Sequence, residues 1–224
     1  MADIWSSYIM PKKGGYGVGD VSPERMYTII SDSANVWAGM GLTHQQIAFG
    51  IATMGVESGF NPAARNPSTA RGLGQFRDKT WPDAVKHYNK TYGQALDPVL
   101  SRENTASQIM VMGAWIEKLW PTAEKFARED PALTVEYAAY GLWHEGQNRD
   151  ITDVKNYLEN PKKFDNADIK GYFGRTLEGA SSVMEIRRRF GTIDRGTGET
   201  LRREGNHVYR VETDGSTRGF FISE

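Results

Sequence analysis

The stretch GVESGFNPAARNPSTARGLGQF, residues 55–76, decides the fold and the chemistry expected of this chain. An apolar helical pattern ends near Glu57, and glycines and prolines then break every regular period from Gly59 to Gly74. We therefore expect a long loop, which in a compact domain is often functional. Such a loop can fold over the Glu57 carboxylate, and partial burial would raise its pKa, as a general acid requires. Gln75 adds an amide suited to sugar hydroxyl or acetamido groups.

Helical patterns surround this loop on both sides. Ser22 before Pro23 predicts a helix start, and Gly41 is the expected end of that helix. Thr43 and Gln46 form a capping-box pattern for the helix that leads to Glu57. Further helices are expected over residues 80–92, 102–120, 132–141, from about 150 onward, and 175–189.

The motifs in this region resemble those of the soluble-type lytic transglycosylases, relatives of goose-type lysozyme. The resemblance covers roughly residues 25–150 and rests on three motifs in a fixed order, namely Glu57-Ser58, Gly72-Leu73-Gly74-Gln75 and Ala139-Tyr140-Gly141. Many family members carry asparagine where this chain has Gly141, so the third match is the weakest. The order and spacing of all three make the combined pattern specific.

The resemblance implies a mainly α, lysozyme-like (α+β) fold with a cleft for a glycan strand. It implies cleavage of the MurNAc-GlcNAc β-1,4 bond, with Glu57 both protonating the linking oxygen and deprotonating the muramyl 6-hydroxyl. The product would be a 1,6-anhydromuramyl end. Ser58 would hydrogen-bond near the reacting sugar, and Gln75 and Tyr140 would line the cleft.

Each of these residues also has a structural interpretation. Ser58 could bond its own helix end, Gln75 could brace the loop, and Tyr140 could be a core tyrosine. Glu145 follows the third motif and is a candidate cleft residue, because a second carboxylate facing Glu57 would allow hydrolysis, with the separation of the two groups reporting inversion or retention. The alternative is a surface carboxylate beside a histidine.

The chain divides into three expected parts. Residues 1–21 form an N-terminal arm, residues 22–190 the catalytic domain, and residues 191–224 a short β-like extension with turn signals between its strands. The extension is too small to hold a core alone. We expect it to pack on the helical domain or on a partner.

Composition narrows the partners and the location. The 224 residues have a formal net charge of −1, which gives no sign of a nucleic-acid binder. There is no cysteine, and the four histidines show no metal-ligand spacing, so no cofactor or metal is expected. No apolar stretch has the length of a membrane span, and Met1 to Gly19 lacks a signal-peptide core.

The expected partner is therefore the glycan strand of bacterial peptidoglycan, reached without an export signal. The expected substrate lies outside the cytoplasm, whereas the sequence shows no export signal. This mismatch favours a bacteriophage protein made in the host cytoplasm, either a released lysin or a virion-associated enzyme with virion partner proteins. Three rival functions remain open: a hydrolytic muramidase, a chitinase, and a non-catalytic virion component that binds the wall.

Overall fold

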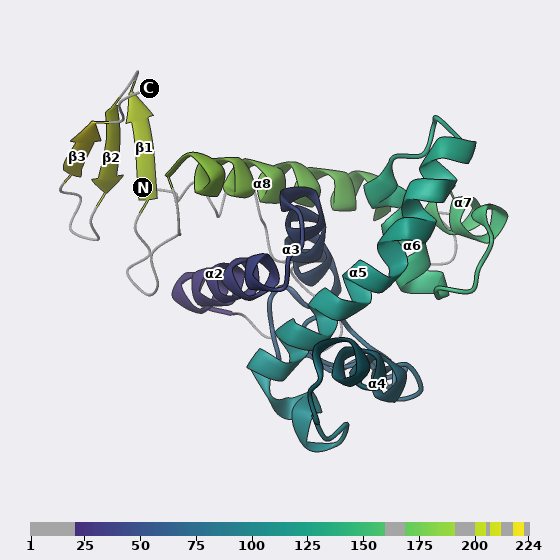
Figure 1. Ribbon diagram of the computed structural model, residues 1–224. Coiled ribbons are helices and arrows are strands. Elements are labelled where there is room, and N and C mark those ends of the chain that lie inside the picture. The colour runs from purple at the N-terminus through teal and green to yellow at the C-terminus, as the bar shows by residue number, and fades with distance from the viewer. Residues whose placement is uncertain (1–20, 160–168, 191–199, 205–206, 212–216, 222–224) are drawn as a thin grey trace.

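Helices dominate the part of the chain that the structure describes. The computed structural model describes residues 21–159, 169–190, 200–204, 207–211 and 217–221, which Figure 1 shows as coloured ribbon. The α-helices are α2 (Pro23–Gly39), α3 (His44–Ser58), α4 (Trp81–Tyr92), α5 (Thr105–Glu129), α6 (Val135–Glu145), α7 (Ile151–Glu159) and α8 (Ile169–Phe190), and a 3₁₀ helix, η1 (Leu100–Glu103), precedes α5. The expectation of a mainly α fold is confirmed.

The helix that carries Glu57 is defined at both ends by local signals. The Gln46 backbone N–H donates to Thr43 Oγ1 at 3.3 Å, and the Thr43 N–H donates to Gln46 Oε1 at 2.8 Å, which completes the predicted capping box. Gly59 ends α3 in the left-handed conformation, with φ 59°. Glu57 therefore lies in the last turn of α3, as the sequence predicts.

Helix α3 is the buried centre of the fold. Every residue from Ile47 to Val56 is buried, because α2, α5 and α8 pack around α3 (Figure 1). A Cβ at Gly50 would lie 2.5 Å from the Trp37 ring, so only glycine lets α2 approach α3 this closely. The Trp37 indole in turn donates to the Ile109 carbonyl of α5 at 2.7 Å. Packing against these three helices therefore fixes the position of α3, the helix that carries Glu57.

Two helices are longer than the sequence predicts. Helix α5 continues past residue 120 to Glu129 with Pro121 inside it, because Ala123 and Phe126 extend its buried face while Pro121 stays exposed. Helix α8 begins at Ile169 rather than near residue 175, and its early residue Phe173 is fully buried. In both cases tertiary burial outweighs the local signal.

Helix α6 passes through Gly141, which was expected to end it, and continues to Glu145. A Cβ at Gly141 would lie 2.5 Å from Val154 Cγ1 of α7. Gly141 is therefore a packing residue, since the missing side chain leaves the space that Val154 fills. This contact explains why the third motif has glycine here.

We predict that Gly141→Ala destabilises the protein by about 1–3 kcal/mol, because the added methyl overpacks the contact between α6 and α7. Gly39→Ala, in a helix with nothing within 4 Å of the new Cβ, is the matched control and should be neutral or stabilising. Urea unfolding of both variants measures the difference. Equal unfolding midpoints would show that the contact is not tight.

Three short strands are described near the C-terminus. Their backbones pair antiparallel in the order β1 (Thr200–Glu204), β2 (His207–Val211) and β3 (Thr217–Phe221). The expected N-terminal arm lies outside the described residues, except for residue 21, and so do the predicted turns at 205–206 and 214–215.

Candidate functional site

Glu57 faces a cleft of about 330 Å³ beside the loop of residues 59–80. This volume lies at the lower end of the roughly 300–1,000 Å³ typical of ligand sites. The loop contributes most of the lining, and α5 and α6 contribute the rest. The other lining residues are Asn66, Ser68, Ala70, Gly74, Gln75, Phe76, Arg77, Thr80, Trp115, Trp143 and His144. Of the described residues that line this cleft, Glu57 is the only one with a carboxylate.

Tyr140 holds the Glu57 carboxylate. Its hydroxyl donates to Glu57 Oε1 at 3.1 Å, and its ring stacks on Phe173 of α8 with centroids 4.3 Å apart. Burial, and then the charge of Glu57, raises the pKa of Tyr140 well above its usual value, so the hydroxyl keeps its proton as a donor. Tyr140 is 1% exposed and is absent from the cleft lining. It therefore contacts the cleft through the Glu57 carboxylate, and a contact of Tyr140 with the substrate stays a prediction.

The loop that faces Glu57 contains an unusual concentration of left-handed backbone. Phe60, Thr69 and Gln75 all have positive φ, at 63°, 74° and 50°, although none is glycine. Such conformations cost about 1–3 kcal/mol each and persist only where surrounding contacts enforce them. The contacts that hold this loop are therefore part of the site.

Gln108 of α5 supplies the first of these contacts. It is 4% exposed, and its Oε1 accepts from the Leu73 N–H at 2.8 Å. Its Nε2 donates to the carbonyls of Pro62, at 3.0 Å, and Arg102, at 2.8 Å. A Cβ at Gly72, where φ is 76°, would lie 2.6 Å from Gln108 Oε1. The first glycine of the second motif is therefore needed for this amide to reach the loop.

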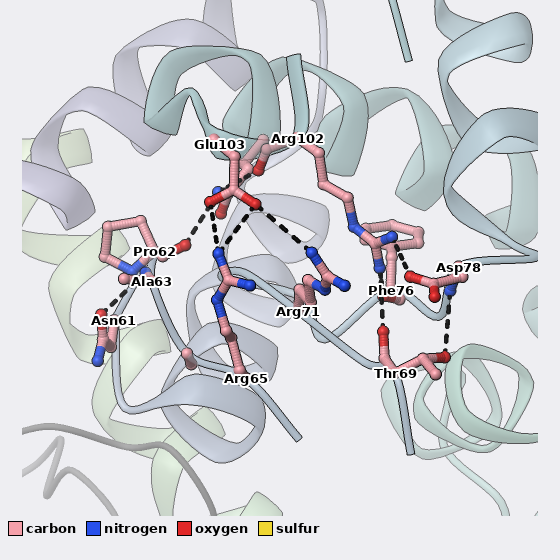
Figure 2. Close-up of polar contacts among 12 residues, drawn as sticks. Asn61, Pro62, Ala63, Arg65, Thr69, Arg71, Phe76, Asp78, Arg102 and Glu103 are labelled. Carbon is pink, nitrogen blue, oxygen red and sulfur yellow. Dashed lines mark hydrogen bonds and ion pairs between the residues drawn. The ribbon is translucent and has the colours of Figure 1, made fainter. Parts of the chain in front are cut away.

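Arg102 supplies the second contact, from η1 (Figure 2). Its Nη2 donates to the carbonyls of Phe76, at 2.6 Å, and Thr69, at 3.2 Å, while Nη1 pairs with Asp78. One guanidinium thus joins Thr69 to the later loop residues Phe76 and Asp78. Because this side chain is only 12% exposed, solvent screens its contacts less than it would on an open surface.

Glu103, the next residue of η1, pairs with two arginines of the same loop (Figure 2). Its carboxylate lies 3.3 Å from Arg65 and 3.7 Å from Arg71, whose backbones form an isolated β-bridge. These side chains are substantially exposed, so each pair contributes little to stability. Glu103 therefore links the two loop segments that carry Arg65 and Arg71 without contributing much to stability.

Gln75 lines the cleft and also braces the loop. Its Nε2 donates to the carbonyls of Gly72, at 2.9 Å, and Ala64, at 3.3 Å. Both amide N–H groups are thus directed at the loop, which leaves the carbonyl oxygen to accept from a ligand. The two interpretations of Gln75 are therefore compatible.

The structure does not bring Ser58 into the cleft. Its side chain is fully buried, and its hydroxyl donates to the Met54 carbonyl one turn back in α3, at 3.1 Å. The expectation that Ser58 contacts the sugar does not fit this position. The alternative, a hydrogen bond within its own helix end, describes it.

Glu145 is also absent from the cleft lining. It is the last residue of α6, its side chain is 16% exposed, and its Oε1 lies 3.4 Å from His144 Nδ1. The neighbouring His144 lines the cleft instead. The structure shows Glu145 pairing with a histidine that lines the cleft, and a direct contact of Glu145 with the substrate stays a prediction.

Sequence reasoning missed Trp143, Trp115, Arg77 and His144. Trp143 had a usable signal, because it follows Tyr140 by three positions on one helix and so shares its face. Its indole donates to the Gly74 carbonyl at 3.1 Å, which ties α6 to the loop. Trp115 lines the cleft although it is 6% exposed.

We predict that Gln108→Ala destabilises the protein by about 1–3 kcal/mol, because the buried Leu73 N–H loses its acceptor. Activity should fall as well, since the loop is released from its strained conformation. Gln94→Ala removes an exposed amide and is the control. If chemical denaturation gave both variants the same stability, the Gln108 contacts would not hold the loop.

One family of known proteins matches this chain. The family described as phage tail lysozyme matches residues 28–140, half of the chain, and this chain belongs to that family. It is thus a lysozyme-like enzyme of bacteriophage type that acts on peptidoglycan in the bacterial cell wall. The matched region contains Glu57, Gln75 and Tyr140 and ends before α7.

A second similarity is to Hsp70-Hsp90 organizing protein 3 of Arabidopsis thaliana, at 26% identity over 130 residues. It covers 49% of this chain and 23% of that protein, so the chain spans less than a quarter of the length of this curated relative. Separately, none of the helices in the described ranges combines the length and apolar character needed to cross a membrane.

Proposed function

We propose that this enzyme cleaves the MurNAc-GlcNAc β-1,4 bond as a lytic transglycosylase, with Glu57 as its acid/base. The observation that carries the proposal is that Glu57 is the only carboxylate among the described lining residues. Hydrolytic glycosidases usually place two carboxylates about the scissile bond, roughly 5–9.5 Å apart. An intramolecular attack needs only one group that first gives and then takes a proton.

In the first step Glu57 gives its proton to the oxygen that leaves C1 of the muramyl residue, and the C1–O bond breaks. In the second step the muramyl 6-hydroxyl attacks C1 and returns its proton to Glu57. A C1–O6 bond forms, the enzyme regains its starting protonation, and no water is consumed. The hydroxyl of Tyr140 stabilises the carboxylate between the two steps.

A hydrolytic muramidase is the second candidate. His144 lines the cleft and pairs with Glu145, an arrangement that could orient or deprotonate a water molecule. Water would then attack C1 in place of the 6-hydroxyl. The two reactions differ in their products, which are anhydromuramyl ends and reducing muramic ends.

We expect digestion of purified peptidoglycan to yield 1,6-anhydromuramyl ends, detected by mass spectrometry. Glu57→Gln should lower the rate by about 10²–10⁴-fold, because the amide can neither give nor take the proton. Glu124→Gln, an exposed change on α5 outside the cleft, is the matched control.

Reducing muramic ends without anhydro ends would replace the transglycosylase by the muramidase. Unchanged wall clearing by the Glu57→Gln variant would exclude Glu57 as the catalyst and favour a non-catalytic virion component that binds the wall. Activity on chitin oligomers but not on purified wall would favour a chitinase.

We further propose that residues 22–190 are the catalytic domain, preceded by an arm (1–21) and followed by a β-like extension (191–224). Antiparallel pairing of β1, β2 and β3 supports the extension as one unit. Its role is to dock the enzyme to the wall or to virion partner proteins. The enzyme is either a released lysin or a virion-associated enzyme, made in the host cytoplasm.

Deletion of residues 191–224 tests the extension. We expect the shortened chain to keep its helical content and thermal transition but to sediment less with purified walls. Loss of folding together with binding would make the segment structural.

A further inference from the structure

Tyr157 of α7 connects two parts of the site from outside the region that the family match covers. Its side chain is buried, with 1% exposure. Its ring stacks on the His144 ring with centroids 4.1 Å apart and planes 20° from parallel. On another side it packs against Tyr140, with ring centroids 6.0 Å apart. His144 lines the cleft and Tyr140 holds Glu57, so one phenol contacts both supports.

The place of this ring is fixed by helix packing. Helix α7 lies against α6, where Val154 occupies the space left by Gly141. Tyr157 follows Val154 by three positions and therefore shares its inward face. Both residues are almost completely buried, so the ring of Tyr157 cannot leave without opening the contact between the two helices.

The hydroxyl of Tyr157 interacts electrostatically with the carboxylate of Glu57. Burial, and next the negative charge of Glu57, raises the pKa of Tyr157 far above its usual range. The hydroxyl of Tyr157 is therefore held in its protonated form. Tyr157 and Tyr140 also interact directly, and this interaction contributes to the raised pKa of Tyr140.

We propose that Tyr157 is a positioning residue with two separable roles. Its hydroxyl acts through Tyr140 to hold Glu57 in its reactive orientation, and its ring holds His144 against the wall of the cleft. The proposal rests on the proposed function of Glu57. It predicts that the hydroxyl affects the chemical step, whereas the ring also affects the shape of the cleft that binds substrate.

A double-mutant cycle on the full chain tests the first role. Tyr157→Phe keeps the ring and removes the hydroxyl, so kcat should fall about tenfold while KM stays unchanged. If the hydroxyl acts through Tyr140, the double variant Tyr140→Phe/Tyr157→Phe should be no slower than Tyr140→Phe within about twofold. Tyr88→Phe, at a buried tyrosine of α4 outside the cleft lining, is the matched control.

The second role is tested by Tyr157→Leu, which removes the stacking surface of His144. This variant should raise KM in addition to lowering kcat, and urea unfolding selects conditions in which every variant is native. Identical KM values for Tyr157→Leu and Tyr157→Phe would overturn the role of the ring.

The outcomes separate this inference from the function on which it rests. An unchanged kcat in Tyr157→Phe, with Glu57→Gln inactive, would overturn the positioning role and leave the catalytic role intact. Losses that multiply in the double variant would show that Tyr157 does not act through Tyr140. An active Glu57→Gln would instead refute the proposed function.

Discussion

The burial of α3 is the constraint on which the rest of this structure depends. A helix enclosed by α2, α5 and α8 cannot shift or turn without disturbing all three. Its last turn therefore offers Glu57 at a fixed point, and Gly59 then sends the chain directly into the loop. A functional group on an enclosed element is placed more exactly than one on a loop, which suits a group that must transfer protons over hydrogen-bond distances.

The loop that follows α3 is held by side-chain contacts and not by enclosure between helices. It has little regular structure, and its strained residues are held by side chains that arrive from elsewhere, chiefly Gln108 and Arg102. Most of these contacts end on backbone carbonyls or N–H groups of the loop, so they fix its conformation largely independently of the side chains it displays. Lining residues could therefore vary while the frame beneath them stays the same.

Features set by neighbouring residues were predictable from the sequence, and features set by distant contacts were not. The capping box at Thr43 and the position of Glu57 at a helix end depend on a few adjacent residues. Gly141 was wrongly expected to end its helix, because its role depends on Val154, which lies on another helix. Pro121 shows that an apolar face can carry a helix through a residue that usually stops it.

The same difference between local and distant features holds for the candidate site. Motifs located Glu57, Gln75 and Tyr140, but they did not say which way a side chain points. Ser58 is buried in its own helix end, and His144, which the motifs did not single out, lines the cleft. Gln108, which supports the loop, belongs to none of the three motifs and is recognisable only when α5 is seen beside the loop.

The glycine at position 141 has a consequence for a neighbouring helix. Many soluble-type transglycosylases, which this sequence resembles, carry asparagine there, but in this structure any Cβ would lie 2.5 Å from Val154 Cγ1 of α7. Tyr157 lies on the same face of α7 as Val154, so a side chain at position 141 would disturb the contact that places its phenol against Tyr140 and His144. The absence of a side chain at one position of α6 is thus a condition for the aromatic contacts made by another helix.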